Sequence, residues 1–269
     1  DLTFEKDANN LKITYSENDK AIINGFFEED ATFDSIVTNE GMKSILSEAK
    51  IKTTVADNDS YNAIKYNEIV EIEGSATISG LSNKDTIKIN ADNISYEQGG
   101  TSFESDLIIK YLLNEETKTV TIKNYLNTDT GLPAAPQGSN LKLKLGENTA
   151  KELIVNQFAS AAQETVIENN ENQEIITSNN NDTVSITGTG NNSVQGGTGS
   201  NTITISGTDE TSENIITITG TSLDDSDPEN IVPASVQTIS VDGGKNTITV
   251  ENGKAEITTG TGENIVNVE

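Results

Sequence analysis

A short pattern recurs in the last third of the chain: an Asn or Asp, then alternating apolar and polar residues, then a turn that contains glycine. It begins at Asp182, Asn192 and Asn201, which stand ten and then nine residues apart. A segment of this size cannot bury its own apolar face, so it becomes stable only when neighbouring segments stack and share one core. The interval fits one half-turn of a coil made of a short strand and a turn. We therefore predict a parallel β-roll or β-helix over residues 161–269; an antiparallel meander with Asn-Gly turns is the alternative.

Stacking of this pattern predicts two rows of side chains along the coil. The apolar row comprises Val184, Ile203, Ile216, Ile248 and Ile265. The polar row comprises Asp182, Asn192, Asn201, Asn214, Asn246 and Asn264. Stacked Asn side chains hydrogen-bond to one another and need no metal ion to do so. Glycines such as Gly188, Gly190, Gly197 and Gly199 are expected to provide the positive φ angles of the corners.

The composition changes near residue 160. Residues 1–160 hold fifteen of the seventeen lysines, and no aromatic residue follows Ala162. We therefore expect two domains, residues 1–160 and residues 161–269, joined near residues 158–166.

The first domain carries a repeated β-hairpin pattern. Residues 1–27 and 106–126 both begin Asp-Leu, continue through an alternating strand and a polar turn, and end with a second strand. Residues 76–100 have a further strand-turn-strand pattern, and alternation with a period of two is typical of half-buried strands. Short helices are expected at residues 41–50 and 149–161. The predicted fold class is all-β, with tandem β-hairpin or sandwich-like modules followed by the parallel coil.

The charge and the missing residue types limit the functions open to this chain. It has 43 acidic residues, 17 basic residues that are all Lys, no His, no Cys and a net charge of -26. Such a surface repels nucleic acid and anionic membranes, and no apolar run is long enough to span a membrane. Without His or Cys, the usual general base, thiolate nucleophile and transition-metal ligands are missing. We therefore expect no enzymatic activity, no nucleic-acid partner and no direct membrane insertion.

The start at Asp1 without a visible signal peptide leads us to expect a processed or excised part of a longer chain.

One stretch of the coil resembles a known calcium-binding repeat. The sequence GGTGSNTIT at residues 196–204 fits the nonapeptide G-G-x-G-x-D-x-U-x at every position except the aspartate, which is Asn201 here. Together with the Asp-Leu hairpins, it resembles bacterial repeat-in-toxin proteins that are secreted by the type I pathway, including surface-layer proteins with haemolysin-type calcium-binding associated modules. In that family, calcium lies between successive turns and is held by Asp carboxylates and turn carbonyls. The resemblance therefore implies calcium as a ligand, whereas Asn201 favours a coil whose Asn residues bond without metal.

Calcium prefers six to eight oxygen ligands, several of them charged. The best acidic candidates are Asp182 at the start of a repeat, Asp209 in the loop 207–214, and a cluster in the loop 223–230. That cluster comprises Asp224, Asp225, Asp227 and Glu229. Weaker acidic clusters lie at residues 26–34 and 55–60. A solvated acidic loop without any ion is the alternative for each cluster.

We expect a structural extracellular protein of the bacterial cell surface, part of a surface layer or matrix. Its partners would be neighbouring copies of the same protein, with calcium bridging acidic surfaces. One alternative is the stalk or glycan-binding portion of a large adhesin, with exposed aromatic residues as a platform. The candidates for that platform are Tyr15, Tyr61, Tyr66 and Tyr96. Another alternative is a non-catalytic fragment of a toxin or secreted hydrolase.

Overall fold

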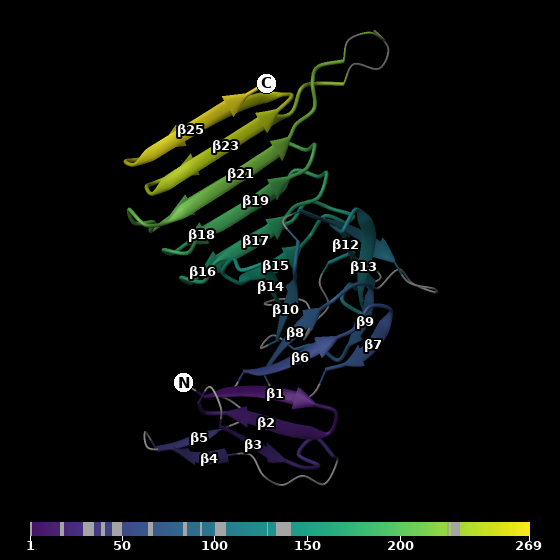
Figure 1. Ribbon diagram of the computed structural model, residues 1–269. Helices are drawn as coiled ribbons and strands as arrows, with labels where there is room; N and C mark the ends of the chain where they lie inside the picture. The colour runs from purple at the N-terminus through teal and green to yellow at the C-terminus, as the bar shows by residue number, and fades with distance from the viewer. Residues whose placement is uncertain are drawn as a thin grey trace. The chain divides into compact units, whose positions relative to one another are not determined.

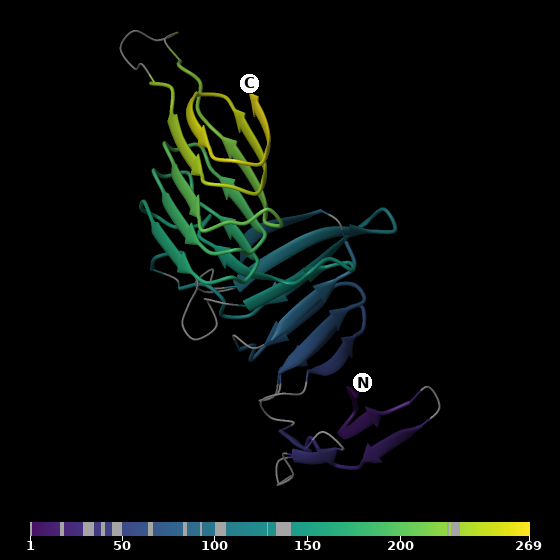
Figure 2. The same cartoon turned by 90° about the vertical axis from the view of Figure 1, so that its left-hand side faces the viewer.

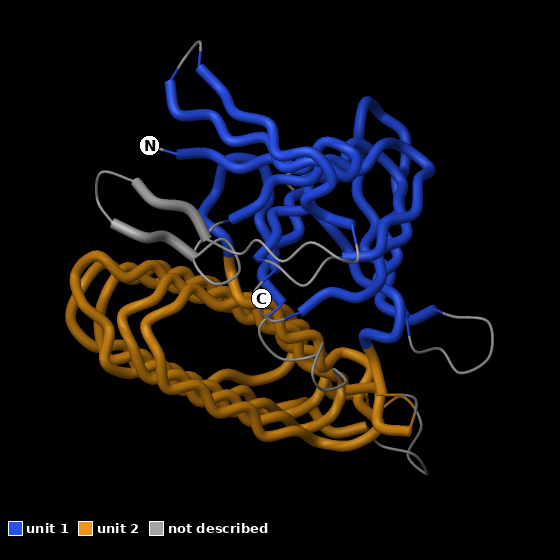
Figure 3. Tube along the Cα trace, turned by 90° about the horizontal axis from the view of Figure 1, so that it is seen from below, with its two compact units in different colours: residues 1–125, 135–150 blue, residues 126–134, 151–269 orange. Residues whose placement is uncertain are grey.

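A computed structural model shows an all-β chain that divides into two compact units (Figure 3). Unit 1 comprises Asp1–Tyr125 and Ala135–Ala150, and unit 2 comprises Leu126–Ala134 and Lys151–Glu269. The residues that the structure describes are 2–16, 19–28, 35–38, 41–44, 50–63, 67–82, 85–91, 93–99, 106–127, 129–132, 141–224, 226 and 232–269. Within these residues there are strands and turns and no helix, and hence none long and apolar enough to cross a membrane.

Unit 2 is a β-solenoid with two parallel sheets. One sheet contains β15 (Lys151–Val155), β17 (Gln173–Ile176), β19 (Asn192–Gly196), β21 (Glu213–Thr219), β23 (Lys245–Glu251) and β25 (Glu263–Val268). The other contains β16 (Glu164–Glu168), β18 (Thr183–Thr187), β20 (Thr202–Ser206), β22 (Val236–Val241) and β24 (Lys254–Thr259). The chain alternates between the sheets, so each strand is one half-turn, and neighbours within a sheet are parallel (Figures 1 and 2). The parallel coil is thereby confirmed, and the antiparallel meander is excluded for this unit.

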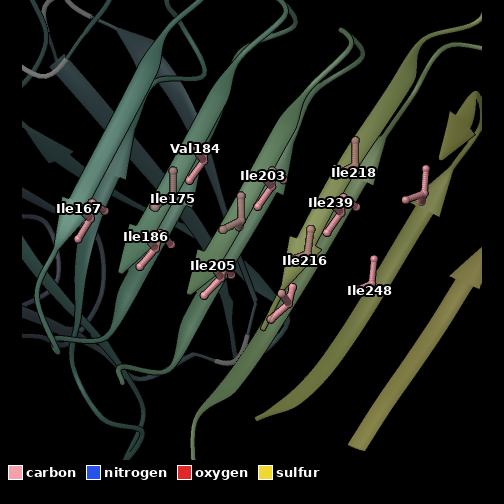
Figure 4. Close-up of a cluster of buried hydrophobic side chains, with 13 residues drawn as sticks. Ile167, Ile175, Val184, Ile186, Ile203, Ile205, Ile216, Ile218, Ile239 and Ile248 are labelled. Carbon is pink, nitrogen blue, oxygen red and sulfur yellow. The ribbon is translucent and has the colours of Figure 1, made fainter. Parts of the chain in front are cut away.

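Aliphatic side chains from both sheets fill the coil (Figure 4). Alternate residues of each strand point inward, which is the period of two that the sequence shows. The buried members are Ile167, Ile175, Val184, Ile186, Val194, Ile203, Ile205, Ile216, Ile218, Ile239, Val241, Ile248 and Val250. Because the space between the two sheets is narrow, Ile and Val fill it without any aromatic residue.

The prediction of one apolar row was wrong, because successive repeats lie in opposite sheets. Val184 pairs with Ile203 in one sheet, whereas Ile216 pairs with Ile248 in the other. Ile265 belongs to neither row: it lies opposite Thr247 and is 60% exposed. Residues about one full turn apart, not one half-turn apart, are therefore the stacking partners.

The expectation of positive φ angles holds for Gly188, at 153°, and was wrong for Gly190, Gly197 and Gly199. Glycine is instead required at the last two because successive turns approach closely there. A Cβ atom on Gly197 would lie 2.1 Å from the backbone oxygen of Ser178, and one on Gly199 would lie 2.0 Å from that of Asn180. Real Cβ atoms do not approach an oxygen so closely, so these two positions accept no other residue without a shift of the turn.

Unit 1 contains parallel stacking as well as hairpins. One set of neighbouring strands is β3 (Lys20–Ile23), β2 (Asn10–Thr14), β1 (Thr3–Asp7), β6 (Ile51–Val55), β8 (Glu68–Ile72), β10 (Thr86–Ile89) and β14 (Leu141–Leu145). The second is β11 (Ile94–Gly99), β12 (Asp106–Leu113), β13 (Glu116–Ile122), β9 (Ala76–Ser79) and β7 (Asp59–Asn62). The backbone of β4 (Ser35–Thr38) and β5 (Gly41–Ser44) forms a separate antiparallel pair. Strands β1, β6, β8, β10 and β14 are parallel, and so are β7, β9 and β13, so the chain coils here too.

The two Asp-Leu hairpins exist, but the segment between them is different. β1 pairs antiparallel with β2, and β12 pairs antiparallel with β13. Asn114 and Glu115 have φ values of 53° and 67°, as a tight hairpin turn requires. In contrast, β9 and β10 lie in different sheets, so these two strands do not form a third hairpin.

Both helix predictions were wrong where the structure describes the chain. Residues 41–44 form β5, and residues 45–49 lie outside the described part. Residues 151–155 form β15, in which Leu153 and Val155 are fully buried on one face. Pairing with β17 fixes this segment as a strand, because period-two burial outweighs its moderate helix propensity.

Candidate functional site: the polar corners of the coil

Several corners of unit 2 carry a buried polar side chain just before the inward-facing residues of a strand, and most of these side chains are amides. In the β15 sheet, the Asn192 side-chain Nδ2 donates to Asn214 Oδ1 at 2.9 Å, and Asn214 Nδ2 donates to Asn246 Oδ1 at 2.9 Å. Asn246 Nδ2 in turn donates to Asn264 Oδ1 at 2.8 Å. Asn192, Asn214 and Asn246 are each no more than 2% exposed. The predicted Asn ladder is confirmed for these four residues, which we call the first ladder.

A second ladder runs along the corner of the opposite sheet. Here the oxygen of each side chain accepts a hydrogen bond from the backbone N–H of the residue one turn earlier. The Asp182 N–H donates to Asn201 Oδ1 at 3.1 Å, and the Asn201 N–H donates to Gln237 Oε1 at 3.0 Å. The sequence predicts a single polar row, and the structure separates it into two because the repeats alternate between sheets.

Asn201 of the second ladder stands where the nonapeptide pattern has its aspartate. Asn201 Nδ2 donates to the backbone oxygens of Gly197 at 3.2 Å and Gly199 at 3.0 Å, and Gln237 Nε2 donates to Gly199 O at 2.8 Å. Amide N–H groups therefore bind the carbonyl oxygens of this turn. Because these oxygens already accept hydrogen bonds and the side chains are neutral, this corner does not fit calcium.

Asp182 is the one acidic residue of these ladders, and donors from the chain surround its carboxylate. Oδ1 accepts from the backbone N–H of Gln163 at 2.7 Å, and Oδ2 accepts from the N–H and hydroxyl of Ser178 at 2.9 and 2.8 Å. The side chain is 2% exposed. Its position suits a structural acceptor at the start of the second ladder.

The same corner occurs in unit 1, where the sequence analysis missed it. Asp85 Oδ2 accepts from the N–H and hydroxyl of Ser82 at 2.6 and 2.9 Å, and Oδ1 accepts from the Glu68 N–H at 2.9 Å. Glu68 Oε1 in turn accepts from the hydroxyls of Thr53 at 2.8 Å and Tyr61 at 2.5 Å. Burial raises the pKa of Asp85, although these hydrogen bonds favour its charged form. Burial and the Glu68 carboxylate together raise the pKa of Tyr61.

A signal for these missed residues is present in the sequence. A polar residue stands two positions before the first inward-facing aliphatic residue in SNKDTIKI, residues 82–89, just as it does in the recognised repeats. Gln173 and Gln237 also fit this rule but were missed, because only Asn and Asp were considered. Both Gln side chains are fully buried.

Asp209, the second predicted metal ligand, organises its own loop. Its Oδ1 accepts from the N–H and hydroxyl of Thr211 at 2.8 and 2.7 Å, and from Ser212 as well. The hydrogen bonds from Thr211, followed by those from Ser212, hold the pKa of Asp209 below its usual range.

Asp209 also lines a hollow of about 440 Å³ at the edge of unit 2. Asp242 lines it too, and accepts from the hydroxyl of Thr208 at 2.6 Å and the Gly207 N–H at 2.7 Å. Burial opposes ionisation of Asp242, but these hydrogen bonds prevail and lower its pKa. Glu210, Lys245 and Glu263 also line the hollow, which makes it polar with an acidic excess.

The third predicted cluster is described only in part. Asp224 Oδ1 accepts from the N–H and hydroxyl of Ser226 at 3.0 and 2.6 Å, which lowers its pKa. Asp225, Asp227 and Glu229 lie outside the described residues, so the cluster as a whole stays a prediction. Across the described part of the chain, no three acidic side chains come close enough together to share a metal ion.

The tyrosines proposed as a glycan platform have different environments. Tyr15 is 55% exposed, but Tyr96 is only 7% exposed, which is inconsistent with a place on an open platform. Tyr61 is half-buried and donates to Glu68, and Tyr66 lies outside the described residues.

No family model, no curated protein and no solved structure matches this chain. The functional conclusion therefore rests on the geometry of the corners, the core and the surface.

Proposed function

We propose that this chain is a structural, non-enzymatic protein of an extracellular bacterial surface layer or matrix. The observation that carries the proposal is the first ladder, in which each buried amide donates to the next. With this ladder and the aliphatic core, successive turns hold together without a ligand. A coil of this kind suits a mechanical role, because its order does not depend on the supply of an ion.

Calcium enters the proposal as a bridge between molecules and not as a part of the corners. The acidic hollow at Asp209 and Asp242, with Glu210 and Glu263, supplies exposed carboxylates near one edge of unit 2. With a net charge of -26, neighbouring molecules repel one another until a cation neutralises part of that charge.

The test is a calcium titration of the purified chain from chelator into the millimolar range, followed by light scattering and circular dichroism. We expect the β-sheet signal to be complete in chelator and the particle size to grow as calcium is added. A β-sheet signal that requires calcium would contradict the ligand-free coil. Unchanged particle size would contradict calcium bridging.

A matched pair of variants localises the bridge. Glu210→Gln removes one carboxylate of the hollow, whereas Glu168→Gln removes an exposed carboxylate at the end of β16. We expect Glu210→Gln to raise the calcium concentration needed for growth and Glu168→Gln to leave it nearly unchanged. Equal effects would mean that total charge, and not the hollow, controls assembly.

The stalk of a larger adhesin is the second candidate, because a ligand-free coil also serves as a spacer. Its glycan-binding form has weaker support, since Tyr96 is buried. A glycan array with the intact chain tests that form directly, and reproducible binding to a defined glycan would favour it.

A further inference from the structure

The first ladder follows a residue whose side-chain hydrogen bonds run in the opposite direction. Gln173 stands opposite Asn192 in the register of the neighbouring strands β17 and β19, and both side chains are buried (Figure 1). Asn192 Nδ2 donates to Asn214 on the next turn, at 2.9 Å. Gln173 Nε2 instead donates to Glu152 Oε2 on the preceding turn, at 3.2 Å. The donors of Gln173 and Asn192 therefore serve opposite directions along the coil.

The oxygen atoms of the same two amides are left without a donor. Gln173 Oε1 and Asn192 Oδ1 are both buried, and neither accepts a hydrogen bond from the part of the chain that the structure describes. We call these two oxygens the acceptor pair. Buried acceptors are nearly always bonded, because an unbonded one loses its contact with water and gains nothing in return. Two of them at consecutive positions of one row call for a group that donates to both.

Other neighbours fix the orientation of each amide. Gln173 Nε2 also donates to Asn169 Oδ1 at 3.1 Å and to the backbone oxygen of Glu171 at 3.2 Å. Asn192 Nδ2 also donates to the backbone oxygen of Gly190 at 2.9 Å. Exchange of the oxygen and nitrogen positions in either amide would place an oxygen against these acceptors. A flip of one amide in place therefore does not satisfy the acceptor pair.

Glu152 explains why the direction changes at this point of the row. A carboxylate accepts hydrogen bonds and cannot donate one, so the amide that follows Glu152 turns its N–H group towards it. From Asn192 onward, each amide donates to the next turn. A row that starts with an acceptor and then donates forward has one position at which two acceptors follow each other. That position is the step from Gln173 to Asn192.

We propose that Glu152 reverses the row and that one buried water molecule binds at the acceptor pair, donating one O–H to Gln173 Oε1 and the other to Asn192 Oδ1. Water carries two donors in one small group, and buried waters commonly bridge polar groups of this kind. A cation fits less well, because the pair supplies two neutral oxygens and a buried charge needs more compensation than they give. Through this water the polar row is continuous from Glu152 to Asn264.

The first test is a high-resolution crystal structure of the intact chain, grown in chelator and soaked in rubidium chloride. We expect a density peak within about 3 Å of both oxygens of the acceptor pair. The peak should give no anomalous signal at the rubidium absorption edge. An anomalous signal there would identify a cation, and the absence of any peak would mean that the chain satisfies the two oxygens itself. Either result would overturn the proposal.

The second test removes the cause of the reversal with Glu152→Gln. The new amide donates to Gln173 Oε1, which lets Gln173 Nε2 turn and donate to Asn192 Oδ1. All donors of the row then point to the next turn, and the water is no longer needed. Oxygen-17 relaxation dispersion of the solvent counts long-lived internal waters, and we expect the count to be lower by one in this variant. An unchanged count would overturn the role given to Glu152.

Two further variants complete this test. Glu168→Gln makes the same change of charge on an exposed residue of β16 and should keep the wild-type count. Gln173→Met removes one acceptor of the pair with little change in side-chain length, so it should also lose one water. An unchanged count in Gln173→Met, or a lower count in Glu168→Gln, would contradict the proposed site. Circular dichroism shows whether each variant is folded, and work in chelator keeps this result separate from calcium-bridged assembly.

Discussion

The corners of the two units use different chemistry for the same task. In unit 2 the corner side chains are mainly amides, and in unit 1 they are the carboxylates of Glu68 and Asp85. An amide both donates and accepts, so each amide inside a row can bond to the next, although Asn192 Oδ1 at the start of the first ladder is buried without a partner in the described chain. A carboxylate only accepts, so each one needs its own donors, which in unit 1 are hydroxyls and backbone N–H groups. Amide corners therefore extend to any number of turns, whereas carboxylate corners need a dedicated donor set at every turn.

The largest expected effect comes from placing a carboxylate inside the amide row. Asn214→Asp replaces the N–H that donates to Asn246 with an oxygen that repels it, at a position that is 1% exposed. We expect a loss of about 3 kcal/mol in the free energy of unfolding at neutral pH. Urea denaturation measures it.

The control for this prediction is Asn267→Asp, which makes the same change on an exposed residue of β25. This change should lower the free energy of unfolding by less than about 0.5 kcal/mol. At low pH the protonated carboxyl group of the Asn214→Asp variant can donate again, so part of the loss should return. Equal costs for the two variants would show that the ladder does not stabilise the coil.

A second variant places an aspartate at Asn201, where the calcium-binding nonapeptide has one, and so compares an amide with a carboxylate at the same corner. Asn201→Asp removes the N–H groups that donate to Gly197 and Gly199, so their carbonyls lose a partner. In chelator we expect the free energy of unfolding of this variant to be about 2 kcal/mol lower than that of the wild-type chain. Millimolar calcium should recover part of it in this variant and have little effect on the midpoint of wild-type unfolding, as differential scanning calorimetry would record. No calcium response in the variant would mean that the amide has not simply replaced an ion.

The opposite exchange in unit 1 has a smaller expected effect. The pKa of Asp85 is raised by burial, so ionisation of this carboxyl costs stability. The corresponding stabilisation is complete below the ordinary Asp pKa and is lost as pH rises through the higher folded-state pKa. Asp85→Asn removes this pH dependence and weakens the hydrogen bonds from Ser82. We expect the free energy of unfolding to change by about 1 kcal/mol in total.

Urea denaturation at a series of pH values between about 4 and 8 checks the Asp85 prediction. The variant should show a flatter profile than the wild-type chain, whereas Asp59→Asn, on an exposed residue, should keep the wild-type profile. A steeper profile in Asp85→Asn would contradict the raised pKa.

The smallest effect is expected at Asp242. Its lowered pKa means that its contribution is present above the ordinary Asp pKa and is lost as pH falls through the lower folded-state pKa. Because the side chain is exposed, Asp242→Asn should lower the melting temperature at neutral pH by only about 1–2 °C. The difference from wild type should vanish at strongly acidic pH, and a difference that persists there would point to a cause other than ionisation.

The sequence predicts the coil of unit 2 well, because alternation and glycine spacing report local geometry directly. The sequence predicts the polar side chains of the ladders but not their division into two rows. Hydrogen bonds join residues a full turn apart, and alternation alone does not show which strands share a sheet. Asp85 was overlooked, although its surroundings in SNKDTIKI match those of Asp182. The parallel turns of unit 1 were missed because antiparallel hairpins and long connections interrupt their repeat. Leu153 and Val155 show the remaining cause of error, since pairing with a distant strand decided the structure of a segment with moderate helix propensity.

The second ladder also shows how this coil accommodates extra chain. Asp182 and Asn201 are 19 residues apart, whereas Asn201 and Gln237 are 36 apart, yet the hydrogen bonds across both steps are nearly the same length. β21 ends at Thr219 and β22 begins only at Val236, yet β20 and β22 keep their parallel register. The site between β21 and β22 is therefore a natural graft point: a peptide epitope or a small domain inserted there leaves the alignment of neighbouring turns intact. By the same property, a gene encoding such a coil can diversify what it displays while its framework stays constant.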